Sequence, residues 1–159
     1  MATVTSTLED TLYNIKAYVE GSLYIYLDAM GVTKDDGLAL EDMKVHVVGD
    51  TDALKQNRYP MAFYYPMEIA VEPLDLNEDE ITMKVYVAFI LKGADGDKLV
   101  TKALRYSDCL RTLVNADHTL ASACDYARVE KVNYYSAEPG GENIMEIESI
   151  LAVTLTVAN

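Results

Sequence analysis

The chain has 159 residues, half of them hydrophobic, and its 13 basic and 26 acidic residues give a formal net charge of −13. A chain of this length buries roughly two thirds of its unfolded surface, so we expect one folded domain spanning residues 1–159. The acidity argues against a nucleic-acid-binding surface and against docking on anionic lipids, because both need clustered Lys and Arg. It is compatible with a basic partner, with a surface that must not hold DNA, and with a simple solvated acidic surface.

The cysteine content and the N-terminal sequence further limit the class of protein that this chain can belong to. Cys109 and Cys124 are too few for a disulfide framework, and the chain has no CxxC motif or Cys/His cluster that would indicate a zinc site. The N-terminal sequence has no basic stretch followed by an apolar core, and no run of about 18 apolar residues occurs. We therefore expect a soluble protein made in the cytosol, with no cofactor.

The first predicted element is an amphipathic helix over residues 8–30. Ser6 and Glu9 have the spacing of a capping box at its start, and Gly31 can end it. Gly21 predicts a kink or an earlier end. The apolar residues recur at spacings of three and four, which places them on one helix face that we assign to the core: Leu8, Leu12, Ile15, Val19 and Leu23.

A short strand and an interrupted strand follow this helix. Residues 31–43 form an acidic loop, and the alternation over residues 43–48 predicts a short strand. Residues 61–70 predict an edge strand, or two short strands with a break, because Pro66 has no N–H to donate to a sheet. The most acidic stretch, 72–80, is predicted to be a connecting loop.

The clearest pattern lies between residues 81 and 157. Apolar residues occupy alternate positions through 81–91 and again through 144–157, where only Ser149 interrupts the series. Between these two strands, apolar residues near helical spacing predict an amphipathic helix over 98–115. Asp95 and Gly96 are typical of a turn, and we expect Asp97 to cap that helix.

The remaining segments complete the expected fold. A connection over residues 117–123 leads to a strand over 125–135, and a loop over 136–143 joins this strand to the last one. The order helix, strands, helix, strands is typical of an α+β fold. We expect a mainly antiparallel sheet packed by a long N-terminal helix and a central helix. The odd-numbered residues of the two long strands should form the core, which leaves their even-numbered residues and the sheet edges for contacts.

No catalytic motif occurs in the sequence. His46 and His118 lie outside any metal-binding spacing, and no local motif supports Cys109 with His118 as a nucleophile pair. The stretch Ala94–Asp97 reads as a turn and helix cap, since the residues after it supply none of the ligands of a calcium loop. We therefore predict no enzyme activity and no catalytic, cofactor or metal site. A small cytosolic enzyme or ligand-binding domain, with a concave polar pocket, is the alternative of a different class.

Twelve tyrosines and no tryptophan indicate where contacts can form. The pairs Tyr64–Tyr65 and Tyr134–Tyr135 fall in predicted strands, so one ring of each pair should face outward. Exposed tyrosine is common at protein–protein interfaces, and packing on the sheet surface of one subunit is the alternative.

Several stretches together resemble one protein family. They are V-Y-V-A-F-I-L-K (85–92), K-A-L-R-Y-S-D-C-L-R-T-L (102–113) with the pattern R-Y-x-D-x-L-R, V-N-Y-Y (132–135) and the final strand, preceded by V-V-G-D (47–50) and Y-P-M-A-F-Y-Y-P (59–66). In this order, after a long N-terminal helix, they resemble the tail terminator (tail-completion or neck) proteins of long-tailed bacteriophages and phage tail-like particles.

The resemblance implies a structural virion protein and no catalysis. Such proteins form a homo-oligomeric, hexameric ring that caps the tail tube and joins it to the head–tail connector protein. Implied partners are therefore further copies of the chain, the tube protein and the connector, with assembly in the host cytoplasm and no membrane. Six copies would carry a charge of about −78, six times −13, which suits a ring through which DNA passes without specific binding.

The candidate residues for subunit contacts or the ring lumen come from the outward tyrosines, the polar side of the last strand and the acidic stretch. They are Tyr134, Tyr135, Glu146, Glu148, Glu78, Asp79 and Glu80. Another head–tail joining protein, or a tail-tube subunit that polymerises, is the nearest alternative within the same class of particle.

Overall fold

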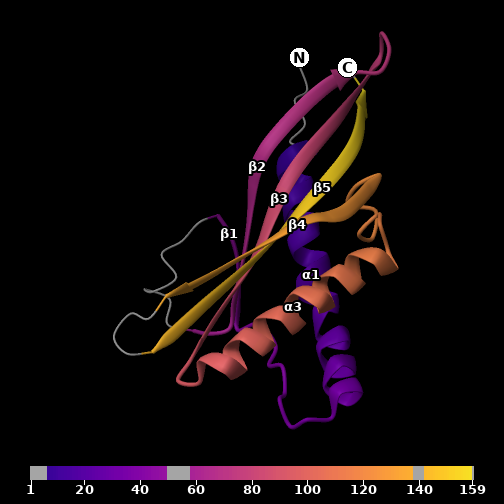
Figure 1. Cartoon of the computed structure of the whole chain (residues 1–159). Coiled ribbons are helices and arrows are strands. Elements are labelled where there is room, and N and C mark those ends of the chain that lie inside the picture. Colours follow the sequence, from indigo (N-terminus) through magenta and orange to yellow (C-terminus); the bar gives the residue numbers. More distant parts are fainter. Residues whose placement is uncertain (1–6, 50–57, 138–141, 159) are drawn as a thin grey trace.

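The computed structural model describes residues 7–49, 58–137 and 142–158, which form a five-stranded sheet with two helices on one of its faces (Figure 1). In chain order the elements are α1 (Thr7–Lys34), β1 (Val45–Val48), β2 (Met61–Pro73), β3 (Glu78–Gly93), α3 (Gly96–Ala116), β4 (Tyr126–Ala137) and β5 (Asn143–Ala158).

The strand order is β1-β2-β3-β5-β4. The β1–β2 pairing is parallel, and the β2–β3, β3–β5 and β4–β5 pairings are antiparallel. The predicted α+β class, with a mainly antiparallel sheet, a long N-terminal helix and a central helix, is thus confirmed.

The core lies between the sheet and the helices, as the alternation in the two long strands predicts. Odd-numbered residues of β3, such as Val85 and Phe89, are buried with Ile147 and Leu151 of β5 against α1 and α3. The opposite face, here called the open face, carries a second, smaller buried cluster at one end of the sheet: Met61, Phe63, Ala88 and Ile90.

Helix α1 is longer than predicted. It runs through both Gly21 and Gly31 to Lys34, so neither glycine ends it. The expected apolar stripe is buried from Leu12 onward, with Leu8 partly buried, and it continues through Leu27; this packing outweighs the low helix propensity of glycine. Ser6 of the predicted capping box lies outside the described residues.

The cap of α3 is also different from the prediction. Asp95, not Asp97, is the N-cap residue, and its side chain accepts a hydrogen bond from the Lys98 N–H at 3.2 Å. The helix therefore begins at Gly96, two residues before the predicted start. Asp97 lies in the first turn, where its negative charge suits the helix dipole.

The largest correction concerns residues 72–80, which are not a loop. Strand β2 continues to Pro73 and β3 begins at Glu78, so only residues 74–77 turn the chain. Pro66 does not break β2. A register shift between Pro66 and Glu68 accommodates it, and pairing with β3 resumes up to Pro73, opposite Asp79. A long antiparallel hairpin replaces the predicted loop.

Candidate assembly surfaces

The hairpin formed by β2 and β3 extends beyond the helix layer at its turn, while Met83 and Val85 of β3 are still buried in the main core. We call residues 66–85 the hairpin arm. Its turn lies at the top of Figure 1, beyond the first turn of α1, whereas the end of β3 and the start of α3 lie at the bottom. β1 pairs only with residues 61–64 of β2, so no described strand pairs with the outer edge of residues 66–73. This open edge is able to pair with another chain.

Large apolar side chains are exposed along the hairpin arm. About half of the surface of Met67, Ile69, Val71 and Leu74 is exposed, and Leu76 in the turn is 95% exposed. By register, Ile69 and Val71 lie opposite Met83 and Ile81, on the face that the helices cover elsewhere. Contiguous exposed apolar residues on an unpaired edge are typical of an interaction surface.

The turn of the hairpin arm is locally ordered and strongly acidic. The Asp75 carboxylate accepts hydrogen bonds from the N–H groups of Asn77 and Glu78 at 2.6 and 3.0 Å. No Lys or Arg occurs anywhere between residues 66 and 83, while six acids do: Glu68, Glu72, Asp75, Glu78, Asp79 and Glu80. We call residues 72–80 the acidic tip.

The open face of the sheet carries a tyrosine–carboxylate cluster. Tyr65 and Tyr86 pack edge to face, with ring centroids 4.8 Å apart, and the Tyr65 hydroxyl donates a hydrogen bond of 2.7 Å to Glu148. Glu148 is only 6% exposed. Its carboxylate raises the pKa of Tyr135, whose exposed ring lies on the same face. The Tyr65 hydroxyl of β2 thus reaches across β3 to the buried carboxylate of β5.

The structure divides the seven candidate residues between two faces and two ends of the sheet. Tyr135, Glu146 and Glu148 lie on the open face toward one end, and Glu78 and Glu80 lie on the same face at the acidic tip. Asp79 and Tyr134 lie on the helix-side face. The Tyr134 hydroxyl contacts the sulfur of Met145 at 2.6 Å, and Tyr134 remains 40% exposed. Of each predicted tyrosine pair, one ring does face each side of the sheet.

At the end of the sheet opposite the acidic tip lies a hollow of about 190 Å³, which we call the base hollow. The described residues lining it are Glu41, Lys44, Tyr59, Pro60, Leu91, Lys92, Leu99, Lys102 and Tyr106. A wider depression beside it shares Lys44, Tyr59 and Lys92 and adds Arg58 and Glu142. Four cations thus gather where the described lining has two acids. No local pattern in the sequence indicates this group, because its members come from separate segments.

Contacts between these side chains shape the base hollow. The Lys92 ammonium lies 3.2 Å from the Glu142 carboxylate and 5.5 Å from the centre of the Tyr59 ring, and Lys44 lies 3.6 Å from Glu41. Lys102 forms no ion pair with any other described residue. The lining thus joins three lysines, of which Lys102 is unpaired among the described residues, with the largely buried side chains of Leu91 and Leu99.

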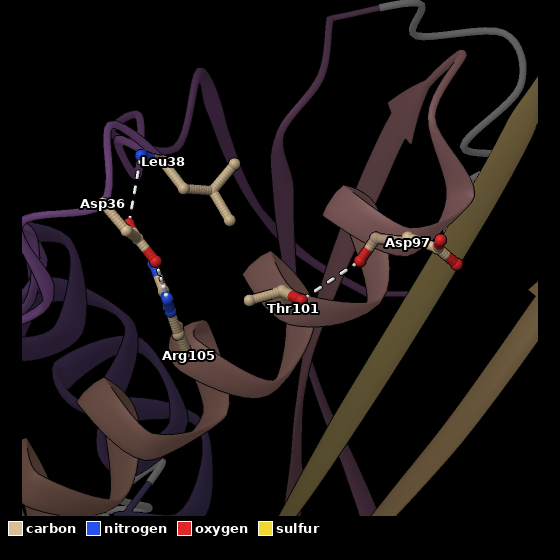
Figure 2. Close-up of polar contacts among 5 residues, drawn as sticks. All are labelled: Asp36, Leu38, Asp97, Thr101 and Arg105. Atoms are coloured by element: carbon tan, nitrogen blue, oxygen red, sulfur yellow. Dashed lines mark hydrogen bonds and ion pairs between the residues drawn. The ribbon is translucent and has the colours of Figure 1, made fainter.

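A loop after α1 is tied to α3 by an ion pair. Arg105 donates to both carboxylate oxygens of Asp36, with Nη1–Oδ1 at 3.1 Å, and the Leu38 N–H donates to the same carboxylate at 3.2 Å (Figure 2). Arg105 holds the pKa of Asp36 down, at about 2. The predicted acidic loop is thus partly fixed to α3 by this ion pair, and is not only solvated surface.

The histidines and cysteines have structural contacts. His46 Nδ1 lies 2.7 Å from the buried Tyr64 hydroxyl, and His118 Nδ1 lies 2.9 Å from the Ala127 carbonyl oxygen. Burial raises the pKa of both Cys109 and Cys124 to about 11, so neither is a reactive thiolate near neutral pH. Among residues 7–49, 58–137 and 142–158, no group of three or more His, Cys, Asp or Glu side chains is placed to hold a metal ion.

No family model and no curated protein matches the sequence. A chain in a solved structure described as "Virion of native gene transfer agent (GTA) particle" aligns with this one at a TM-score of 0.37 and 10% sequence identity. The alignment covers 86% of this chain and 94% of that chain. A similarity at this level assigns neither a family nor a function. Within the described residues, no helix is both long and apolar enough to cross a membrane.

Proposed function

We propose that this protein is a structural component of a phage-like particle, a tail terminator that forms a ring on the tail tube and joins it to the head connector. The observation that carries the proposal is the hairpin arm, with its open edge and exposed apolar side chains on a chain whose sequence resembles that family. The chain folds as one domain and acts without catalysis.

The sheet offers a route to a closed ring. Its two outer edges differ: residues 66–73 of β2 carry only acidic charges, whereas β4 carries Arg128 and Lys131 together with Glu130. Unlike edges on the two sides of one sheet favour heterologous, head-to-tail contacts, which close into rings when the rotation between copies allows it.

Solution mass and electron microscopy of the full chain test the ring. Six copies of a 17.6 kDa chain give a ring of about 106 kDa. Open-ended filaments would instead favour a tube subunit, and a stable monomer with a ligand in a polar pocket would favour the enzyme or binding-domain alternative.

Removal of the chain from the particle that contains it tests the terminator role itself. Without a terminator, tube growth should be unregulated and heads should not attach, so micrographs should show headless tails of uneven length. Particles with joined heads and tails of normal length would contradict the proposal.

A further inference from the structure

The two ends of β3 carry opposite charge. At one end, the acidic tip places five acids within residues 72–80 and no base. At the other end, the base hollow and the depression beside it are lined by four cations, Lys44, Arg58, Lys92 and Lys102, and by two acids, Glu41 and Glu142, which lie 3.6 and 3.2 Å from Lys44 and Lys92. The base therefore has an excess of two positive charges, four minus two, in a chain with a net charge of −13.

These two ends cannot meet within one chain. Glu78 and Lys92 belong to the same continuous strand. At about 3.3 Å per residue, the fourteen steps between them span about 46 Å. The acidic tip and the base hollow can therefore contact one another only when they belong to different molecules.

The acidic tip and the base hollow also match in size. Leu76 projects from the turn with 95% of its surface exposed, flanked in sequence by Asp75 and Asn77. The base hollow, at about 190 Å³, has Leu91 and Leu99 in its lining, with 3% and 6% of their surfaces exposed. A cavity of about 150 Å³ holds a benzene molecule, so the base hollow has room for one leucine side chain.

We propose that the acidic tip of one copy docks in the base hollow of a second copy, with Leu76 among Leu91 and Leu99 and the tip carboxylates against Lys44 and Lys102. An apolar anchor inside a rim of opposite charges is the arrangement that interfaces use for affinity and orientation together.

The contact is heterologous, because each copy offers a tip to one neighbour and a hollow to another. It deepens the proposed function, in that it names a surface by which successive copies of the ring would touch. The contact itself stands on charge and shape in this structure and does not depend on the identity of the particle.

Charge reversal on each side provides the test. The tip variant is Glu78→Lys with Glu80→Lys, and the base variant is Lys44→Glu with Lys102→Glu. Each variant alone should self-associate at least about tenfold more weakly than the wild type at about 0.1 M ionic strength, because like charges then face each other. An equimolar mixture should recover association, since the reversed tip of one chain meets the reversed base of the other. Sedimentation velocity measures all three.

Two controls separate this contact from other effects of charge. Asp28→Lys with Asp108→Lys changes the net charge by +4, as the tip variant does, on exposed positions of α1 and α3, and it should leave association within about twofold of the wild type. Leu76→Ala should weaken association about tenfold without a change in thermal unfolding, because its side chain makes no contribution to the core.

Disulfide trapping detects the contact even when it is weak. Asn77 follows Leu76 in the turn, and the exposed Lys98 precedes Leu99 of the base hollow. Chains with Asn77→Cys and chains with Lys98→Cys, oxidised together, should give a mixed disulfide in preference to either homodimer, whereas the native cysteines are buried. The inference is overturned if the wild-type chain stays monomeric and the two cysteine variants give no mixed disulfide, or if the mixture of reversed chains fails to recover association. Rings that persist in both reversed variants would overturn this contact and leave the terminator proposal standing. A mixed disulfide between chains that form no rings would support this contact and count against the terminator proposal.

Discussion

Tyr65→Phe isolates the hydrogen bond that holds the buried carboxylate on the open face. The Tyr65 hydroxyl lies 2.7 Å from Glu148, which is 6% exposed, so removal of the hydroxyl leaves a buried carboxyl group with one donor fewer. A hydrogen bond to a charged group contributes about 1.5–3 kcal/mol, and because Tyr65 is only half-buried we expect a loss of about 1.5 kcal/mol. In a chain of this size that lowers Tm by about 3–6 °C.

Urea unfolding followed by circular dichroism gives the free energy directly, provided that the transition is two-state. Tyr13→Phe is the matched control, since Tyr13 is exposed on α1 and its hydroxyl bonds to no described residue; it should change stability by less than about 0.5 kcal/mol. In a double-mutant cycle, Glu148→Met, which removes the acceptor, should remove most of the cost of Tyr65→Phe. A Tyr65→Phe chain as stable as the control would refute the view that this cluster supports the sheet.

Three further changes probe the helices and the core. Gly21→Ala should stabilise the chain by about 0.5–1 kcal/mol in the same unfolding assay, since a Cβ there meets nothing within 4 Å and α1 is continuous; a lower stability would contradict that account. Ser149→Ala should raise stability by about 1 kcal/mol, because the buried Ser149 hydroxyl has no hydrogen-bond partner among the described residues, and destabilisation would reveal a partner. The lowered pKa of Asp36 means that its pair with Arg105 stabilises the fold above about pH 4 and that this contribution is lost as pH falls toward 2; Asp36→Asn should abolish that part of the pH dependence of Tm, and an unchanged profile would count against it.

Long strands with one buried face were readable from the sequence. In β3 and β5 every second residue enters the core, so alternation over many residues defines both the strands and their inner face. Ser149, the only polar residue in the alternating series of β5, proved to be buried there with the rest. The apolar residues of α1 were equally easy to predict, because the side chains of a helix that pack against the core must recur at spacings of three and four.

The hairpin arm could not be predicted from the sequence, for a physical reason. Its inner positions, Ile69 and Val71, alternate with Glu68 and Glu72, but acids at the start of β3 have low strand propensity and resemble a solvated loop. Pairing on both sides of β3, with β2 and β5, supplies the backbone hydrogen bonds that override this propensity. Local sequence cannot report a pairing made with a distant strand.

Contacts between segments that are distant in the sequence could not be predicted for the same reason. Asp36 and Arg105 lie 69 residues apart, and the base hollow joins the start of β1, the start of β2, the end of β3 and the first turns of α3. No spacing rule connects such residues. The candidate residues chosen from the sequence therefore included the acidic tip but not the cations that complement it.

Ionic strength provides a last prediction, which follows from the length of β3. Two chains that each carry −13 repel one another overall, while the acidic tip and the base hollow attract locally. At 0.1 M salt the Debye length is about 10 Å, far shorter than the ~46 Å between the two ends, so the local attraction acts with little interference from distant charges. At 0.01 M the Debye length is about 30 Å and the overall repulsion extends to the contact, whereas at 1 M even the local pairs are screened. Self-association measured by sedimentation velocity should therefore be strongest at intermediate salt. A continuous rise with salt would show that apolar contacts alone drive association, and a continuous fall would show that the net charge exerts no opposing effect.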